Sequence, residues 1–110
     1  MGNSTEDCAK RLTDTGADCI GANCGDLDPV QMSVVVSLLK SATTLPILAQ
    51  PNAGKPKLID DKTIFEMAPE QFAVDMAKCI NAGASLVGGC CGTTPEHIQA
   101  LVDMLNNNEK

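Results

Sequence analysis

The six cysteines of the 110-residue sequence include an adjacent pair, Cys90 and Cys91, in the segment GGCCGT, and a third, Cys24, in GANCG. Three thiolates are typical of a catalytic zinc site, because zinc prefers sulfur and nitrogen ligands in a tetrahedron and three protein ligands leave one position open. A substrate thiol bound at that position loses its proton at neutral pH and becomes a good nucleophile toward an activated methyl group. We therefore predict that these cysteines bind one zinc ion that activates a thiol for methyl transfer.

An internal repeat connects the two cysteine segments. Gly16–Gly25 reads GADCIGANCG and Gly83–Gly92 reads GASLVGGCCG, so that Cys24 corresponds to Cys91 at an offset of 67 residues. The offset spans two strand–helix units, and in a closed (β/α)₈ barrel alternate strands contribute to the same interior layer. We expect Cys24 and Cys91 to follow strands separated by one other strand and to approach the same end of the sheet.

Adjacent cysteines on an extended strand would point to opposite faces, so both can reach one ion only if the chain leaves strand geometry there. Gly88, Gly89 and Gly92 surround the pair and tolerate backbone angles that other residues avoid. We therefore interpret the glycines as residues that let the chain bend so that both cysteines reach the same ion. Asn52, after the middle strand, is predicted to occupy the fourth position when no substrate is present, and Asn23 and Gln50 are predicted to support the site.

The sequence alternates helical and strand patterns in one domain, residues 1–110. It predicts, in order, a helix over Thr5–Asp14 capped by Ser4, a strand over Ala17–Ala22, a helix from Pro29 to about Ser41, a strand over Pro46–Gln50, a loop of about fifteen residues, a helix from about Pro69, a strand over Ser85–Gly89 and a helix from Pro95, with a frayed NNNEK tail. Alternating elements favour a parallel sheet with right-handed crossovers. Ligands bind such sheets beyond the carboxyl ends of the strands, where the cysteine segments fall.

Composition excludes several function classes. The net charge is −6 and only 2% of the residues are aromatic, so the chain repels phosphate backbones and anionic membranes and offers few rings for base stacking. We expect neither nucleic-acid nor membrane partners. The polar N-terminus lacks the apolar stretch of a signal peptide, which predicts a cytoplasmic protein. Cysteines in such a protein indicate metal ligands, redox groups or buried small side chains more than disulfides.

Several other residues are expected to be structural. Cys8 and Cys79 fall on helix faces and Cys19 within a strand, so we expect all three to be buried. His97, in the first turn of the last helix, is expected to be solvated, and the run Val34–Val36 with Leu38–Leu39 is expected to lie in the core. Lys55 and Lys57 are expected to be solvated loop charges.

Three segments are similar to the homocysteine S-methyltransferase family, which includes the homocysteine-binding barrel of cobalamin-dependent methionine synthase and betaine–homocysteine methyltransferase. They are GANCG at Gly21–Gly25, QPNAG at Gln50–Gly54 and GGCCGTTPEHI at Gly88–Ile98. The resemblance implies a (β/α)₈ barrel whose zinc is held by Cys24, Cys90 and Cys91. It also implies homocysteine as the fourth ligand and methyl acceptor, and a methyl donor that varies within the family, such as methylcobalamin supplied by another domain or protein.

The chain departs from the family in length, since such a barrel needs about 250 residues. It matches only the C-terminal part, the last three strand–helix units, and most of the family's amino-acid-binding groups come from the other strands. We therefore expect a partial barrel or a small open sheet that self-associates or pairs with the missing barrel half. Two alternatives stay open: a non-catalytic zinc-binding or oligomerisation fragment, and a thiol redox protein that uses Cys90 and Cys91.

Overall fold

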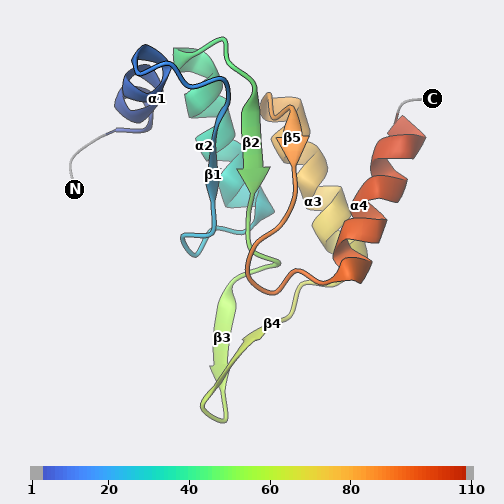
Figure 1. The fold of residues 1–110 in the computed structure, drawn as a ribbon. Helices are drawn as coiled ribbons and strands as arrows, with labels where there is room; N and C mark the ends of the chain where they lie inside the picture. The colour runs from blue at the N-terminus through green and yellow to red at the C-terminus, as the bar shows by residue number, and fades with distance from the viewer. Residues whose placement is uncertain (1–3, 109–110) are drawn as a thin grey trace.

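A computed structural model describes residues 4–108, and Figure 1 shows its arrangement. A three-stranded parallel sheet in the order β1-β2-β5 is covered by helices on one face, and a separate two-stranded hairpin extends beyond it. In chain order the elements are α1 (Thr5–Asp14), β1 (Ile20–Asn23), α2 (Pro29–Ala42), β2 (Ile47–Gln50), β3 (Pro56–Ile59), β4 (Lys62–Phe65), α3 (Pro69–Ala82), β5 (Leu86–Val87) and α4 (Pro95–Asn108). The α/β class and the parallel sheet that the sequence predicts are confirmed.

Capping residues fix where the helices begin, which explains why their starts could be predicted. The Ser4 hydroxyl accepts a hydrogen bond from the backbone N–H of Asp7 (3.1 Å), and Asp28 forms a reciprocal capping box with Gln31. Pro69 and Pro95 each occupy a first helical position, where the missing N–H has no partner to lose. In the described part of the NNNEK tail, α4 continues through Asn108 and is not frayed.

The middle strand β2 pairs with both other strands. Its Ile47–Gln50 segment lies beside Ile20–Asn23 of β1 in parallel register, and its Leu48 lies beside Leu86 of β5. The strands flanking β2 are thus those that precede the two cysteine segments, as the repeat predicts. All three strands point their carboxyl ends toward the hairpin (Figure 1).

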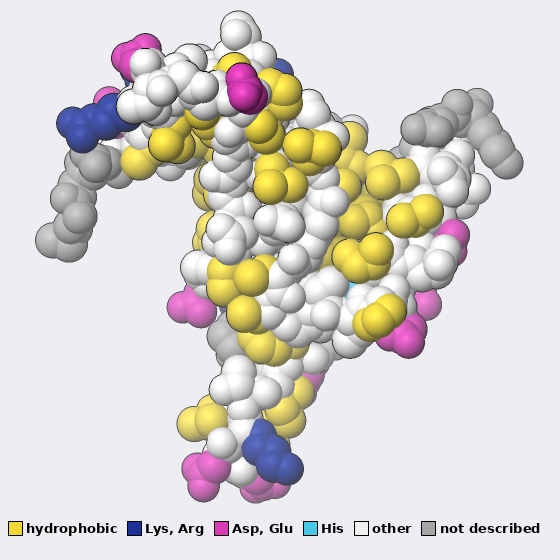
Figure 2. All heavy atoms as spheres, in the orientation of Figure 1, with side chains coloured by type: hydrophobic (Ala, Val, Ile, Leu, Met, Phe, Trp, Pro, Cys, Tyr) yellow, Lys and Arg dark blue, Asp and Glu magenta, His cyan; other side chains and the backbone are white. Residues whose placement is uncertain are grey.

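One face of the sheet is packed against helices and the other is open. Ile20, Ile47 and Ala49 are buried with α2 and α3, which lie behind the sheet in Figure 1. The alternate side chains face the opposite way, and Leu86 among them is 50% exposed. We call this the open sheet face; it consists of Gly21, Asn23, Leu48, Gln50 and Leu86, and Figure 2 views the molecule from its side.

The segment after β2 is not the long loop that the sequence predicts. Residues 56–65 form the antiparallel hairpin β3–β4, in which Ile59 pairs with Lys62 across a two-residue turn. Asp60 and Asp61 in that turn have φ of 51° and 63°. Two positive φ values define the hairpin turn that normally contains Asn-Gly, so Asp-Asp gives no recognisable sequence signal for it. Lys57 lies on the hairpin and pairs with Glu66 (2.8 Å) in solvent, and Lys55 is also exposed.

The apolar run of α2 is only partly core. Val36 and Leu39 are buried, whereas Val34 is 59% and Leu38 39% exposed, which corrects the expectation that the whole run is buried. A helix turns about 100° per residue, so consecutive apolar residues cannot all face the sheet. Within residues 4–108, no helix is long and apolar enough to cross a membrane.

Candidate metal centre

The side chains of Cys24, Cys90 and Cys91 meet at the carboxyl ends of β1 and β5. Their sulfur atoms all lie within 4.8 Å of one another, and the Cys24 and Cys91 sulfurs are 3.5 Å apart. All three cysteines are free thiols. Cys24 and Cys90 are half-buried and Cys91 is exposed, so the cluster is accessible from solvent.

This sulfur arrangement fits a zinc ion. A tetrahedral site with Zn–S bonds of about 2.3 Å separates its sulfurs by about 3.8 Å, close to the spacing of Cys24 and Cys91. Thiolates are soft ligands that favour zinc, whereas magnesium and calcium favour oxygen ligands. The chain therefore offers a three-sulfur donor set with one coordination position left for another ligand.

Cys24 lies in a backbone conformation that few residues with a side chain adopt. Its φ is 55°, and Gly25 and Asp26 follow with 65° and 60°. Two hydrogen bonds hold Cys24 there: its N–H donates to the Gln50 carbonyl (3.1 Å), and its carbonyl accepts from the Leu27 N–H (3.1 Å). Positive φ at a non-glycine residue carries strain, and such strain concentrates at functional sites.

Adjacent Cys90 and Cys91 share one site because β5 ends at Val87, before the pair begins. Gly92 has a φ of 80°, and a Cβ atom at this position would collide with the Phe65 side chain of the hairpin. A Cβ atom at Gly89 would collide with the Thr93 side chain. The prediction that the chain leaves strand geometry is confirmed. Of the three glycines predicted to permit it, only Gly92 has a positive φ, and Gly89 provides space instead.

The loop that leaves β2 connects the two cysteine segments through its backbone. The Cys90 N–H donates to the Pro51 carbonyl, and the Ala53 N–H donates to the Cys91 carbonyl, both at 2.9 Å. On the other side, the Asn52 N–H donates to the Leu27 carbonyl (2.9 Å). Pro51 and Ala53 belong to the QPNAG segment that the sequence singles out, but the residue pattern does not indicate that they hold the cysteines through backbone hydrogen bonds.

Asn52, predicted as the fourth ligand, and Asn23 and Gln50, predicted to support the site, all lie around it. The Asn52 side chain is 2% exposed, and its Oδ1 accepts a hydrogen bond from the Cys91 N–H (3.1 Å). Asn23 directs its Nδ2 toward the Cys90 sulfur at 3.9 Å, so both repeat-related pairs are in contact. The Gln50 side chain lies against Gly88, where an added Cβ atom would be 3.3 Å from Nε2.

Hydrogen bonding between the thiols lowers the pKa of Cys24 and raises the pKa of Cys91. The hydrogen bond with Cys91 is the main factor that lowers the pKa of Cys24, and hydrogen bonds from Cys90, the Gly25 backbone and Asn52 add to it. The same Cys24–Cys91 hydrogen bond raises the pKa of Cys91 to about 11, because the proton is retained between the two sulfurs. Cys24 is thus the first of the pair to become a thiolate.

Of the three cysteines outside the cluster, which were all expected to be buried, Cys79 is the buried one. Cys79 is fully buried in α3, as predicted, and its thiol donates to the Pro29 carbonyl (3.2 Å). Cys8 is only half-buried. Cys19 is exposed, which corrects the prediction that it lies in a strand core: β1 begins one residue later, at Ile20.

His97 is not solvated as the sequence predicts. Its side chain is 7% exposed and packs edge-on against Phe72, with ring centroids 5.5 Å apart. Its Nε2 lies 2.7 Å from the Met67 carbonyl oxygen. The pattern of a helix start indicates the position of His97 correctly, but it does not reveal that the segment before α3 covers this turn.

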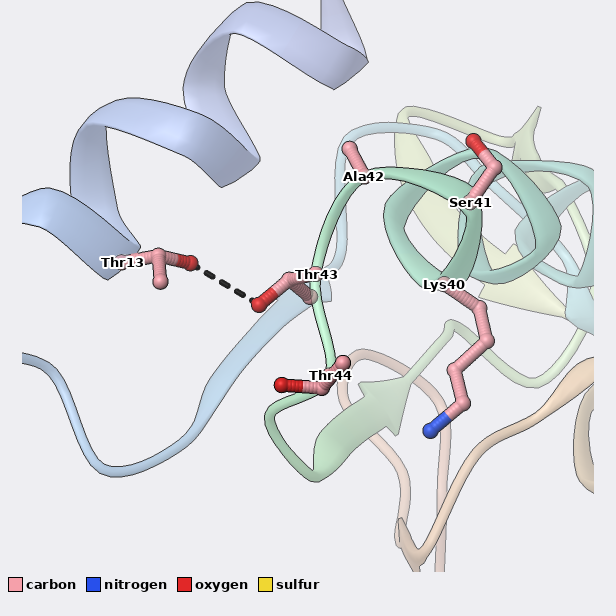
Figure 3. Close-up of a pocket in the computed structure, with 6 residues that line it drawn as sticks. All are labelled: Thr13, Lys40, Ser41, Ala42, Thr43 and Thr44. Carbon is pink, nitrogen blue, oxygen red and sulfur yellow. Dashed lines mark hydrogen bonds between the residues drawn. The ribbon is translucent and has the colours of Figure 1, made fainter.

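A hollow of about 460 Å³ lies at the opposite end of the sheet (Figure 3). Its lining consists of Thr13, Lys40, Ser41, Ala42, Thr43 and Thr44. Thr13 Oγ1 donates to the Ala9 carbonyl (2.7 Å) and contacts Thr43 Oγ1 (2.9 Å), which also accepts from the Leu45 N–H. These bonds join α1 to the end of α2, so the hollow is a structural seam remote from the cysteines.

Comparison with known proteins agrees with this geometry. A sequence model of the family described as homocysteine S-methyltransferase matches residues 1–105, and the chain therefore belongs to the homocysteine S-methyltransferase family. It is 41% identical over 87 residues to a methionine synthase of Mycobacterium leprae (strain TN), which is 78% of this chain. It is 39% identical over 93 residues, or 84% of this chain, to a methionine synthase of Mycobacterium tuberculosis (strain ATCC 25618 / H37Rv).

The matched region is a small part of those relatives. The alignments cover 7% and 8% of the two methionine synthases. Family membership is therefore shown for this chain, whereas the activity, substrates and partners of a whole methionine synthase are not transferred by the match.

Proposed function

We propose that this chain carries the zinc-binding part of a homocysteine S-methyltransferase, with Cys24, Cys90 and Cys91 as the zinc ligands. The observation that supports this most directly is the meeting of three free sulfurs within 4.8 Å of one another at the carboxyl ends of parallel strands. When bound, zinc would supply a Lewis acid that keeps a substrate thiol deprotonated at neutral pH. The reaction is methyl transfer to homocysteine, which gives methionine.

The chain's own residues would prepare this site in two ways. The backbone bonds from Gln50, Pro51 and Ala53 fix where the three sulfurs lie before any ligand binds, which lowers the cost of organising the site. Asn52 holds Cys91 through its Oδ1, and its place beside the cluster supports the proposal that it is the fourth ligand when no substrate is present. In methyl transfer, the homocysteine sulfur forms the new S–C bond as the bond between the methyl carbon and its donor breaks.

The open sheet face limits what the chain does alone. Its five residues, Gly21, Asn23, Leu48, Gln50 and Leu86, are uncharged, whereas homocysteine carries an ammonium and a carboxylate group. We propose that the chain is the C-terminal part of a (β/α)₈ barrel, one partial domain over residues 1–110, and that a second copy or the rest of a barrel completes the pocket. A methyl donor such as methylcobalamin would come from another domain or protein.

A non-catalytic zinc-binding or oligomerisation fragment is the second candidate, and the uncharged open sheet face favours it. Isothermal calorimetry of the zinc-loaded chain with homocysteine separates the two functions. Binding would support the methyltransferase, and its loss in Cys24→Ser would tie binding to the cluster. Heat no larger than that of injecting homoserine, which lacks the sulfur, would favour the non-catalytic fragment.

Metal analysis tests the zinc site itself. After reconstitution under reducing conditions, we expect about one zinc per chain, and a marked loss in each of Cys24→Ser, Cys90→Ser and Cys91→Ser. Cys19→Ser is the matched control, because Cys19 is exposed but outside the cluster. Well under one zinc per chain in the unaltered protein would refute the proposal and reopen the thiol redox alternative.

A further inference from the structure

His97 is a buried titratable side chain that the proposed reaction does not use. It lies in the first turn of α4, six residues after Cys91, and its ring is held at both nitrogens. The Nδ1 atom is 2.7 Å from the Thr94 hydroxyl and 3.2 Å from the Thr94 backbone nitrogen. The imidazole therefore links the start of α4, through Thr94, to the segment that contains Met67.

The partners of the ring determine where its hydrogen lies. The Met67 carbonyl can only accept, so Nε2 carries a hydrogen and donates it. The Thr94 backbone N–H can only donate, so Nδ1 accepts. The neutral ring with its hydrogen on Nε2 satisfies all of these contacts at once. His97 thus accepts a hydrogen bond from the backbone just before α4 and, with its other nitrogen, donates one to a different segment.

That second bond reaches back to the cysteines through Met67. A Cβ atom added at Gly54 would lie 3.2 Å from the Met67 Cβ, so the Met67 segment packs directly on the loop that leaves β2. The neighbouring residues of that loop, Asn52 and Ala53, hydrogen-bond Cys91 at its N–H and its carbonyl.

The first bond reaches the cysteines from the other direction. Thr94 follows Thr93, whose N–H donates to the Cys90 carbonyl (3.2 Å). The path from Cys91 through Asn52, Gly54 and Met67 to His97 therefore returns through Thr94 to Cys90, and it forms a closed ring around the cysteine pair.

We propose that His97 is a positioning residue that fixes Cys90 and Cys91 relative to Cys24 by closing this ring. The proposal rests on the proposed zinc function of the three cysteines. Metal affinity depends on the groups that orient the ligands, and loss of such a group typically weakens it about ten- to a hundredfold. His97 acts one layer further out, through Asn52 and the backbone, so we expect an effect of about tenfold.

Two substitutions at His97 test its contacts with Met67 and Thr94 separately. His97→Gln places an amide N–H about where Nε2 lies, so it keeps the bond to Met67. His97→Asn places an amide oxygen about where Nδ1 lies, so it keeps the bond to Thr94 but is too short to reach Met67. We expect His97→Asn to bind zinc about tenfold more weakly and to shift the visible absorption bands of the Co²⁺-substituted site. His97→Gln should stay within about threefold of the unaltered chain, because the backbone of α4 still connects residue 97 to Thr94 when the side-chain contact is lost.

Ser4→Ala is the matched control for a purely structural effect. It removes the side-chain cap of α1, which is remote from the cysteines, and so lowers helix stability without touching the ring. We expect it to lower the thermal midpoint while leaving the Co²⁺ spectrum and the zinc affinity unchanged.

The outcomes are distinguishable. If the unaltered chain binds neither Zn²⁺ nor Co²⁺, the zinc function itself is wrong. If it binds both metals, and His97→Asn binds them with the same affinity and the same Co²⁺ spectrum, His97 has only a structural role and the inference is wrong. An equal loss in Ser4→Ala would also overturn it, because the effect would then follow general destabilisation.

Discussion

Cys79 shows how strongly a buried thiol differs from the clustered ones. Burial, with a smaller contribution from the negative charge of Asp28, raises the pKa of Cys79 to about 11 from its usual 9.0. Its thiol hydrogen is also committed to the Pro29 carbonyl. Cys79 therefore stays protonated in the folded chain at pH values where an unfolded chain loses this proton.

This difference predicts that alkaline pH destabilises the fold through Cys79. Between pH 9 and pH 11 the folded state binds more protons than the unfolded state, so the free energy of unfolding falls as pH rises, by about 2 kcal/mol from this group. The contribution is fully present below pH 9. Urea unfolding at pH 8 and pH 10.5 measures the fall, and Cys79→Ala should remove that part of it. An equal fall in Cys79→Ala would contradict the prediction.

At the scale of single residues, the sequence was sufficient where a repeated motif indicates which residues lie together. The cluster of Cys24, Cys90 and Cys91 could be predicted because a repeat places their strand ends together. The burial of His97 could not, because it depends on the Met67 carbonyl, thirty residues away in the chain. Cys19 was misplaced because the predicted strand begins at Ala17, whereas β1 begins at Ile20 and leaves Cys19 just outside the sheet.

Among the elements, helices were predicted more accurately than strands. Ser4, Asp28 and Pro95 mark helix starts by side-chain chemistry that acts within one turn, and the predicted α1 bounds match the structure. Strand ends depend on partners elsewhere in the chain, and β5 contains only Leu86 and Val87. The hairpin was missed because its turn lacks glycine.

The Asp-Asp turn of the hairpin is a site for stabilisation. Both residues have positive φ, which Asn and Gly adopt with less strain. We expect the double substitution Asp60→Asn with Asp61→Gly to raise the free energy of unfolding by about 0.5–1 kcal/mol, measured by chemical denaturation. Asp18→Gly is the control, because Asp18 is outside the positive-φ residues and should give no gain. Equal stabilisation by both changes would contradict this explanation.

For the whole molecule, the exposed sheet is the dominant feature. The described part of the sheet has two edge strands, β1 and β5, and its open face exposes Leu86. Parallel sheets are ordinarily covered on both faces, because each strand is apolar on both sides. The sequence predicted the parallel sheet from its alternating elements, but three strands alone do not determine whether a barrel closes.

We therefore expect the chain to self-associate through this face when no barrel partner is present. In sedimentation equilibrium, the apparent mass should rise with concentration over the micromolar range. Leu86→Lys should keep the chain monomeric, because association would bury an unpaired charge. Val74→Lys is the control, since Val74 is 60% exposed on α3, on the far side of the sheet, and should not change association. An unaltered chain that stays monomeric throughout would exclude self-association.

Cys24 and Cys91, which meet at this site, lie 67 residues apart in the chain. A metal bound by both cysteines would close a long loop that includes α2, the hairpin and α3. Closing such a loop restricts the unfolded chain far more than the folded one. If zinc binds as we propose, its supply would set the lifetime of the protein against proteases. A chain made without zinc would lack this constraint and would therefore open to proteases more often than the zinc-loaded chain.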